Sequence, residues 1–214
     1  MNKIGNILFV FCTLCLLIGT SCQHFTPKPR SYFRIHLAEK HYKRSDSTMS
    51  YSFEYPQNIA YIKTNPKDTA WFDIVYPTYN ARIYFSYKQI KDNFQDIAED
   101  SRNFVYKHAF KADAIVENLY VDSIKEVYGM LYEIKGNTAS SVQFLATDST
   151  EHFLRGALYF NNHPNKDSLA PVISYISDDI RHIMETLRWE WLSATHKSTT
   201  FDTAFGTLPK AYPN

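Results

Sequence analysis

The sequence predicts an α+β domain in which a mostly antiparallel sheet carries a central and a C-terminal amphipathic helix. Between residues 31 and 190, apolar and polar residues alternate over short stretches that prolines separate, which is typical of antiparallel strands. In two places the apolar spacing changes to three and four residues, which is typical of helices packed on a sheet. Aromatic residues make up 16% of the chain against only 6 glycines, which favours a well-packed sheet over a flexible chain.

Several strands are expected before the central helix. In the first, Tyr32–Leu37, the apolar residues Phe33, Ile35 and Leu37 alternate with polar neighbours, so one face of this strand is expected to be buried. Prolines near the ends of the following stretches supply turns. The further strands expected here are Tyr51–Tyr55, Ile59–Thr64, Ala70–Tyr76 and Ala81–Tyr87.

The central helix is expected over Gln89–Lys111, because apolar residues recur there at helical spacing with charged residues between them. Residues 148–151, Asp-Ser-Thr-Glu, predict a hairpin turn between the last two of the strands that follow. These later strands are Ala114–Val121, Ile124–Ile134, Ser141–Thr147 and His152–Phe160.

The closing helix is expected to begin near Pro171, after a polar loop over Asn161–Ser168. Its apolar face consists of Val172, Tyr175, Ile176, Ile180, Ile183, Met184 and Leu187. We therefore predict one α+β domain over residues 31–190, followed by a loosely ordered tail over 191–214 that is rich in Ser and Thr.

The N-terminus predicts export. Lys3 precedes an apolar run from Ile4 to Ile18, and small residues followed by Cys22 close it. About 15 helical residues reach roughly 23 Å, less than the roughly 30 Å hydrocarbon layer, which favours a signal peptide over residues 1–21. The small residues before Cys22 resemble a bacterial lipobox, which implies cleavage before Cys22 and its acylation, for example with palmitate. An ordinary signal peptide and a core helix are the alternatives.

Cleavage would leave a neutral polypeptide without thiols. The 23 basic residues less Lys3 balance 22 acidic residues, which argues against nucleic acid as a partner. Cys12 and Cys15 would leave with the signal peptide and Cys22 would carry lipid, so no disulfide or thiolate site is expected. Residues 22–30 form a spacer with two prolines, and no acidic run follows Cys22, which favours a periplasm-facing domain anchored to the outer or inner membrane.

The sequence contains little that predicts catalysis. None of the eight histidines has metal-ligand spacing, no nucleophile motif occurs, and we expect no cofactor or metal. The most enzyme-like cluster is Asp148, His152 and Arg155, in which a carboxylate could orient a general base. We favour a solvated turn with a capping Asp there. Asp178 and Asp179 diverge by about 100° on a helix, so we interpret them as a solvated helix face.

Asp residues followed by Ser or Thr are unusually frequent, at seven of thirteen. Turn chemistry explains such pairs, because both side chains bond nearby backbone N–H groups. Six of the triplets also resemble the acceptor motif for O-glycosylation of exported Bacteroidota proteins. The hydroxyls predicted to be modified are Ser47, Thr69, Ser123, Ser149, Ser168 and Thr203.

Three long strings resemble the GldD family of gliding-motility lipoproteins: residues 138–160, residues 164–189 and the early PKPRSYFRIHL. The resemblance implies a component of the gliding and type IX secretion machinery and no enzymatic reaction. Cys22 is the one functional residue that carries over. The order of strands and helices is also similar to the PsbP/Mog1 type of α+β fold.

Three functions follow as hypotheses. The first is a scaffold or assembly factor that binds other envelope lipoproteins or subunits of the secretion apparatus. The second is a periplasmic hydrolase or glycan-acting enzyme that uses Asp148 and His152. The third is a carrier of a small ligand in an apolar cavity. For the first hypothesis, the expected partner contacts are Tyr32, Arg34, Arg82, Tyr84, Arg155 and Tyr159, because Tyr and Arg dominate interface energetics.

Overall fold

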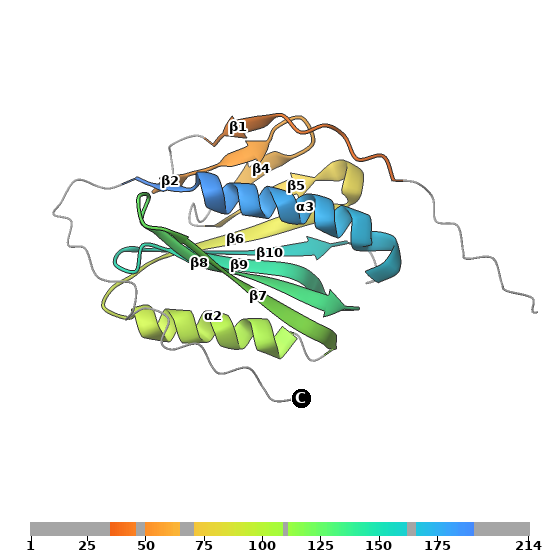
Figure 1. Ribbon diagram of the computed structural model, residues 1–214. Coiled ribbons are helices and arrows are strands. Elements are labelled where there is room, and N and C mark those ends of the chain that lie inside the picture. Colours follow the sequence, from red (N-terminus) through yellow and green to blue (C-terminus); the bar gives the residue numbers. More distant parts are fainter. Residues whose placement is uncertain (1–34, 46–49, 65–70, 109–110, 162–165, 191–214) are drawn as a thin grey trace, which may run out of the picture. The chain divides into compact units, whose positions relative to one another are not determined.

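A computed structural model describes residues 35–45, 50–64, 71–108, 111–161 and 166–190. Its centre is a seven-stranded antiparallel sheet of order β4-β5-β6-β10-β9-β8-β7. The strands of this sheet are β4 (Tyr61–Thr64), β5 (Trp71–Tyr76), β6 (Ala81–Gln89), β7 (Ala112–Asp122), β8 (Val127–Gly136), β9 (Ser140–Thr147) and β10 (His152–Phe160). The helices α2 (Phe94–His108) and α3 (Lys166–Thr186) lie on opposite sides of it (Figure 1). The predicted α+β class is confirmed.

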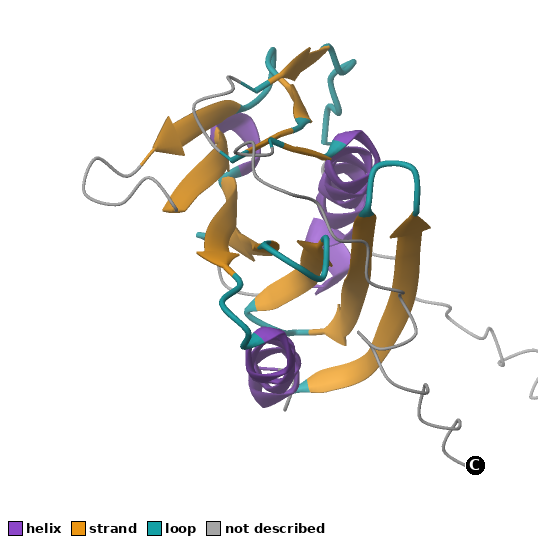
Figure 2. Cartoon of the chain, turned by 90° about the vertical axis from the view of Figure 1, so that its left-hand side faces the viewer, coloured by secondary structure: helices purple, strands orange, loops and turns teal. Residues whose placement is uncertain are grey.

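Two small antiparallel sheets accompany α3. One pairs β1 (Tyr42–Arg44) with β3 (Glu54–Pro56), and the other pairs β2 (Tyr51–Ser52) with β11 (Arg188–Trp189). A short 3-10 helix, Pro77–Tyr79, joins β5 to β6. Figure 2 shows both long helices nearly end-on, with strands between them.

The strand order joins an N-terminal and a C-terminal half. β4, β5 and β6 follow one another in sequence, as do β7, β8 and β9, and β10 lies between β6 and β9. The pairing of β10 with β6 runs from His152↔Gln89 to Phe160↔Ala81. Directly paired residues lie on the same side of a sheet, so this register decides which side chains share a face.

The larger core lies between the sheet and α3. It stacks aromatic rings closely, with the Phe72 and Phe85 centroids 4.4 Å apart and the Phe53 and Phe85 centroids 5.7 Å apart. The apolar stripe predicted for the closing helix is buried here, and Ile176, Ile180 and Ile183 are fully inaccessible. This face therefore carries most of the buried apolar area that stabilises the fold.

A smaller core lies between the sheet and α2. Ile97 and Val105 from the helix pack against residues of β8, β9 and β10, including Met130, Leu145 and Phe153. The central helix is confirmed but shorter than expected, because β6 continues to Gln89. The first helical hydrogen bond runs from the Ile97 N–H to the Asn93 carbonyl.

Some predicted boundaries are wrong. Residues 35–37 form no strand, because polar backbone groups in this segment bond to side chains instead: the Tyr175 hydroxyl donates to the Ala38 carbonyl at 2.5 Å and the Tyr79 hydroxyl to the His36 carbonyl at 3.3 Å. The stretch Tyr51–Tyr55 is divided at Phe53, because β2 pairs with β11 and β3 with β1.

Two further boundaries differ from the prediction. Ile124 lies in a turn over residues 123–126, where Glu126 has φ 54°, and the strand starts only at Val127. The closing helix already begins at Lys166, so Pro171 lies inside it and the expected polar loop is shorter. Pro171 has no backbone N–H, so the helix lacks one hydrogen-bond donor at this position.

Candidate partner-binding face

The sheet side that carries α2 is only partly covered. The residues that pack against α2 come from β7 to β10 and from Ile90, which directly follows β6. The side chains of β4, β5 and most of β6 on the same side lie beyond the helix, and the register brings them together in rows. One row is Tyr61↔Val75↔Arg82↔Tyr159, and the next contains Asp73↔Tyr84.

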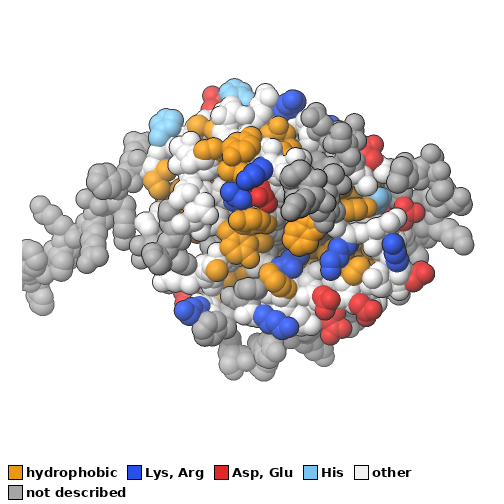
Figure 3. Space-filling view, turned by 180° about the vertical axis from the view of Figure 1, so that it is seen from behind, with side chains coloured by type: hydrophobic (Ala, Val, Ile, Leu, Met, Phe, Trp, Pro, Cys, Tyr) orange, Lys and Arg blue, Asp and Glu red, His pale blue; other side chains and the backbone are white. Residues whose placement is uncertain are grey.

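We name this region the open face. Three of its aromatic side chains are strongly exposed, at 54% for Trp71, 50% for Tyr61 and 43% for Tyr84. The space-filling view from behind shows hydrophobic side chains gathered on part of the surface, with a basic and an acidic side chain in contact among them (Figure 3). The open face consists of Tyr61, Trp71, Asp73, Val75, Arg82, Tyr84, Arg155 and Tyr159.

The side chains of the open face are held by one another. Arg82 Nη1 donates to Asp73 Oδ2 at 3.0 Å, and its guanidinium lies 5.4 Å from the centroid of the Tyr84 ring. The Tyr84 and Tyr159 rings meet edge to face at 5.4 Å. Such contacts reduce the freedom that a partner would have to remove on binding, so the face is preorganised.

Arg155 lies where the open face meets α2. Its guanidinium sits 3.7 Å from the centroid of the Phe104 ring, and Nη2 donates to Gln143 Oε1 at 3.3 Å. Burial lowers the pKa of Arg155, which Tyr159 partly offsets. This side chain therefore fastens the helix to the sheet at the rim of the open face.

Four of the six expected contacts share this face: Arg82, Tyr84, Arg155 and Tyr159. Tyr32 and Arg34 lie outside the described residues. The sequence reasoning missed Trp71 and Tyr61. The alternation in β5 carried the signal for Trp71, since Phe72, Ile74 and Tyr76 point to the core and their neighbours must point away.

The Asp148 and His152 cluster has a different geometry from a catalytic pair. Asp148 Oδ1 accepts the backbone N–H groups of residues 150, 151 and 152 at 2.8 to 3.0 Å, and Oδ2 accepts the Thr150 hydroxyl at 2.9 Å. The capping interpretation is confirmed. The expectation that the turn is solvated is wrong, because Asp148 and His152 are both buried.

His152 is held by aromatic side chains. The Tyr87 hydroxyl lies 2.8 Å from His152 Nδ1. The His152 ring stacks on Trp189, with the ring centroids 5.1 Å apart and an interplanar angle of 3°. Burial lowers the pKa of His152, which favours the neutral ring. The Asp148 carboxylate accepts hydrogen bonds from the turn and not from His152 Nδ1 or Nε2. The geometry therefore gives no support to a general base oriented by that carboxylate.

Asp179 corrects another expectation. Asp178 is exposed and bonds to Arg181, as a solvated helix face requires, but Asp179 is fully buried. Its carboxylate accepts Lys40 Nζ and the Tyr42 hydroxyl on Oδ1, both at 2.7 Å, and the Tyr76 hydroxyl on Oδ2 at 3.1 Å. Burial raises the pKa of Asp179, against the opposing effect of these donors.

The proposed modification sites differ in access. Ser123 is exposed in the β7–β8 turn, whereas the Oγ of Ser149 is buried. Ser168 lies in the first turn of α3 rather than in a loop. Ser47, Thr69 and Thr203 lie outside the described residues, as does Cys22.

Metal binding and membrane crossing can both be assessed in the described residues. These residues contain no group of three or more His, Cys, Asp or Glu side chains placed to hold a metal ion. Of the helices described, none has both the length and the apolar character needed to cross a membrane.

The fold and the open face together define an α+β domain that exposes a preorganised aromatic surface beside two well-formed cores. Comparison with protein families identifies the group to which it belongs. The family described as gliding motility lipoprotein GldD matches residues 22–189, so the chain belongs to that family. This family is not a known family of enzymes, and a lipoprotein is anchored to a membrane of the cell envelope. A search of curated proteins found no match.

Proposed function

We propose that this lipoprotein is a non-enzymatic assembly or scaffold component of the gliding motility and type IX secretion machinery, with its domain in the periplasm. The open face binds another protein of the cell envelope. That partner presents aliphatic or aromatic side chains to Trp71, Tyr61 and Tyr84, and polar groups to the Arg82–Asp73 pair.

The composition of the open face is the observation that carries this proposal. Tyr, Trp and Arg are the residues that contribute most to binding energy at protein interfaces. Here they adjoin on one sheet surface, where Arg82 is paired with Asp73 and Arg155 bonds to Gln143 and lies against Phe104. A partner can therefore cover the rings around the Arg82–Asp73 pair without leaving either of these two charges unpaired.

Membrane attachment supports the same role. Family membership makes the chain a lipoprotein, so its domain stays near other proteins anchored to the same membrane. Confinement raises the effective concentration of one partner near the other, so even a modest interface is populated. An exposed aromatic face is useful under this condition and would be a liability on a freely diffusing protein.

The test is site-specific photocrosslinking in native membranes. A photoreactive phenylalanine replaces Tyr84 on the open face, and in a control it replaces Ile124, which is 96% exposed on the β7–β8 turn. We expect the probe at Tyr84 to capture a subunit of the secretion or gliding apparatus, identified by mass spectrometry, and the probe at Ile124 to capture none.

The functional arm uses substitutions. Cells that carry both Trp71→Ser and Tyr84→Ser should secrete less through the apparatus while the amount of lipoprotein is unchanged, and Ile124→Ser should have no effect. Normal secretion in the double variant, or equal capture from both probe positions, would contradict the proposal.

A further inference from the structure

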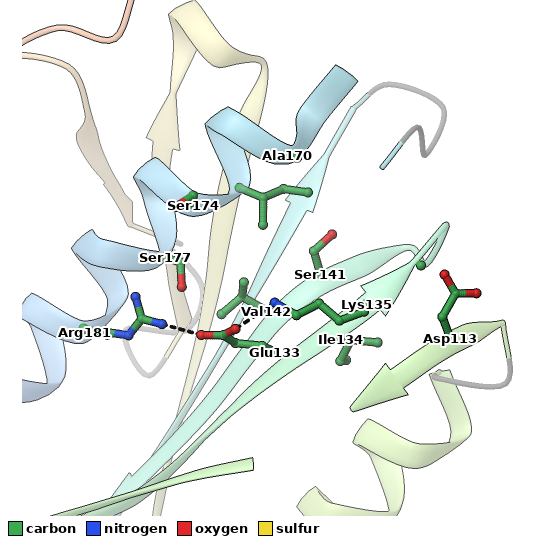
Figure 4. Close-up of a pocket in the computed structure, with 12 residues that line it drawn as sticks. Asp113, Glu133, Ile134, Lys135, Ser141, Val142, Ala170, Ser174, Ser177 and Arg181 are labelled. Carbon is green, nitrogen blue, oxygen red and sulfur yellow. Dashed lines mark hydrogen bonds and ion pairs between the residues drawn. The ribbon is translucent and has the colours of Figure 1, made fainter. Parts of the chain in front are cut away.

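A cavity of about 380 Å³ lies between α3 and the β8–β9 hairpin, on the side of the sheet opposite to the open face (Figure 4). This volume falls within the range of pockets that hold small ligands. The pairing of β8 with β9 ends at Glu133↔Val142, so the two strands separate over residues 134–141. This end of the hairpin forms one wall of the cavity. The helix supplies the other wall.

A buried hydroxyl points to a ligand in this cavity. Ser177 lies on α3 and is only 4% exposed. Among the residues that the structure describes, no group forms a hydrogen bond with its Oγ. Figure 4 shows this hydroxyl directed from the helix toward the strands that line the cavity. A buried hydroxyl without a partner is destabilising, so a ligand with a hydrogen-bonding group would be stabilised here. Ser174 and Ser141 add two further hydroxyls to the lining.

The charges of the lining balance one another. Glu133 accepts hydrogen bonds from both Arg181 and Lys135, the latter at 2.9 Å, and Arg181 also bonds to Asp178 at 3.0 Å. A phosphate dianion would have to displace Glu133 from both cations. Arg181 carries five N–H donors in total, so one further carboxylate can share it.

The two ends of the cavity offer groups of opposite charge to a ligand: a guanidinium shared with Glu133 and Asp178 at one end and a carboxylate at the other. Arg181 lies at one end and Asp113 at the other, with Ser141 between them (Figure 4). A ligand with a carboxylate at one end and an ammonium group at the other matches this order. The apolar lining on the helix side and the strand floor is aliphatic, formed by Val142, Ala170 and Ile173. None of the lining residues described is aromatic, so small aliphatic groups fit better than flat rings.

We propose that this cavity binds a short zwitterionic peptide with small aliphatic side chains. The Ser177 hydroxyl bonds to a peptide group, Arg181 receives the terminal carboxylate and Asp113 faces the terminal ammonium group. The cavity and the open face lie on different sides of the sheet, so this inference does not depend on the proposed function.

Titration of the full-length lipoprotein in detergent with trialanine tests this site, with the methyl NMR signals of Val142 and Ile173 as the readout. We expect saturable shifts of these signals. Trialanine with an acetylated N-terminus and an amidated C-terminus should bind at least about tenfold more weakly, because it lacks both charges. Inorganic phosphate should not compete. Equal affinity for the free and the capped peptide would overturn the proposal, as would the absence of saturable shifts.

Three variants connect the binding to the cavity. Ser177→Ala should weaken trialanine binding about three- to tenfold, the range expected for one hydrogen bond. Ser174→Leu, at an exposed position on the cavity side of α3, should block entry without disturbing the core. The control Ser123→Leu, in the exposed β7–β8 turn, should bind as the wild type does. Unchanged binding in both cavity variants would overturn the assignment, and a normal circular dichroism spectrum would show that each variant is folded.

Discussion

The two sides of the sheet bury very different amounts of their side chains. On the α3 side, stacked aromatic rings, a long amphipathic helix and the two small sheets cover almost every inward position. On the α2 side, a shorter helix covers a core of eight buried residues and leaves β4, β5 and most of β6 open. Each strand of the centre contributes to both sides, so the same backbone supports one surface for stability and another for contact.

This difference shows how the fold separates two demands. Most residues that stabilise the molecule lie on the α3 side, where truncation of a buried side chain should lower the free energy of unfolding the most. The exposed aromatic residues of the open face, Tyr61, Trp71 and Tyr84, contribute little to that free energy, because water already reaches them. Substitutions that compare the two sides should therefore separate stability from binding.

The largest effect is expected at Asp179. Replacement by Ala would remove the ion-pair partner of Lys40 and the acceptor of two tyrosine hydroxyls, so the free energy of unfolding should fall by about 3–5 kcal/mol. The matched control is Asp178→Ala at the adjacent exposed position, which should cost less than about 1 kcal/mol. Urea denaturation measures both, and equal losses would show that the buried network does not stabilise the α3 side.

The second largest effect is the difference in stability that the two cores contribute. Ile180→Ala on α3 should lower the free energy of unfolding by about 4 kcal/mol, and Ile97→Ala on α2 by about 2 kcal/mol. The reason is that the larger core surrounds Ile180 on all sides and leaves a cavity that cannot collapse. Urea denaturation of both variants under the same conditions measures these losses. A larger loss of unfolding free energy for Ile97→Ala than for Ile180→Ala would contradict the prediction.

A pH effect of intermediate size is expected from His152. Burial lowers its pKa in the folded protein below the ordinary value of about 6.5, so the unfolded chain binds a proton more readily. Stability should therefore fall as the pH decreases below about 6.5, by at most about 1.4 kcal/mol per pH unit from this one group. His152→Gln should reduce this slope. An identical slope in His152→Gln would show that this ring does not titrate differently on folding.

The smallest effect on stability is expected on the open face. Trp71→Ser should change the free energy of unfolding by less than about 1 kcal/mol, because more than half of this side chain is already exposed. Partner capture should nevertheless decline. A loss of several kcal/mol would mean that Trp71 belongs to the structure and not to a binding surface.

Local sequence patterns predicted most elements of the sheet and both helices. The alternation in β5, β6 and β10 placed Tyr84 and Tyr159 on one side, and the apolar spacing of α3 identified its buried stripe. Asp148 was also predictable as a capping residue, because the donors to its carboxylate lie within four positions of it.

Interactions between distant parts of the chain could not be predicted in this way. Asp179 is buried because Lys40 and Tyr42, which lie 139 and 137 positions earlier in the chain, cross α3 beside it. The alternation in residues 35–37 predicted a strand, but no neighbouring strand pairs with that part of the described chain. The partial cover of the α2 side depends on where the helix lies on the sheet, which helical spacing does not determine.

The position of β10 between β6 and β9 has a consequence for the order in which the molecule folds. A polypeptide that crosses a membrane N-terminus first delivers β4, β5 and β6 long before the strand that must pair with β6. The final pairing, Trp189 with Tyr51, requires nearly the whole matched region to have arrived. Until β10 has arrived, the edge of β6 that pairs with it lacks its neighbour, so we expect folding to be slow and apolar surface to be exposed transiently.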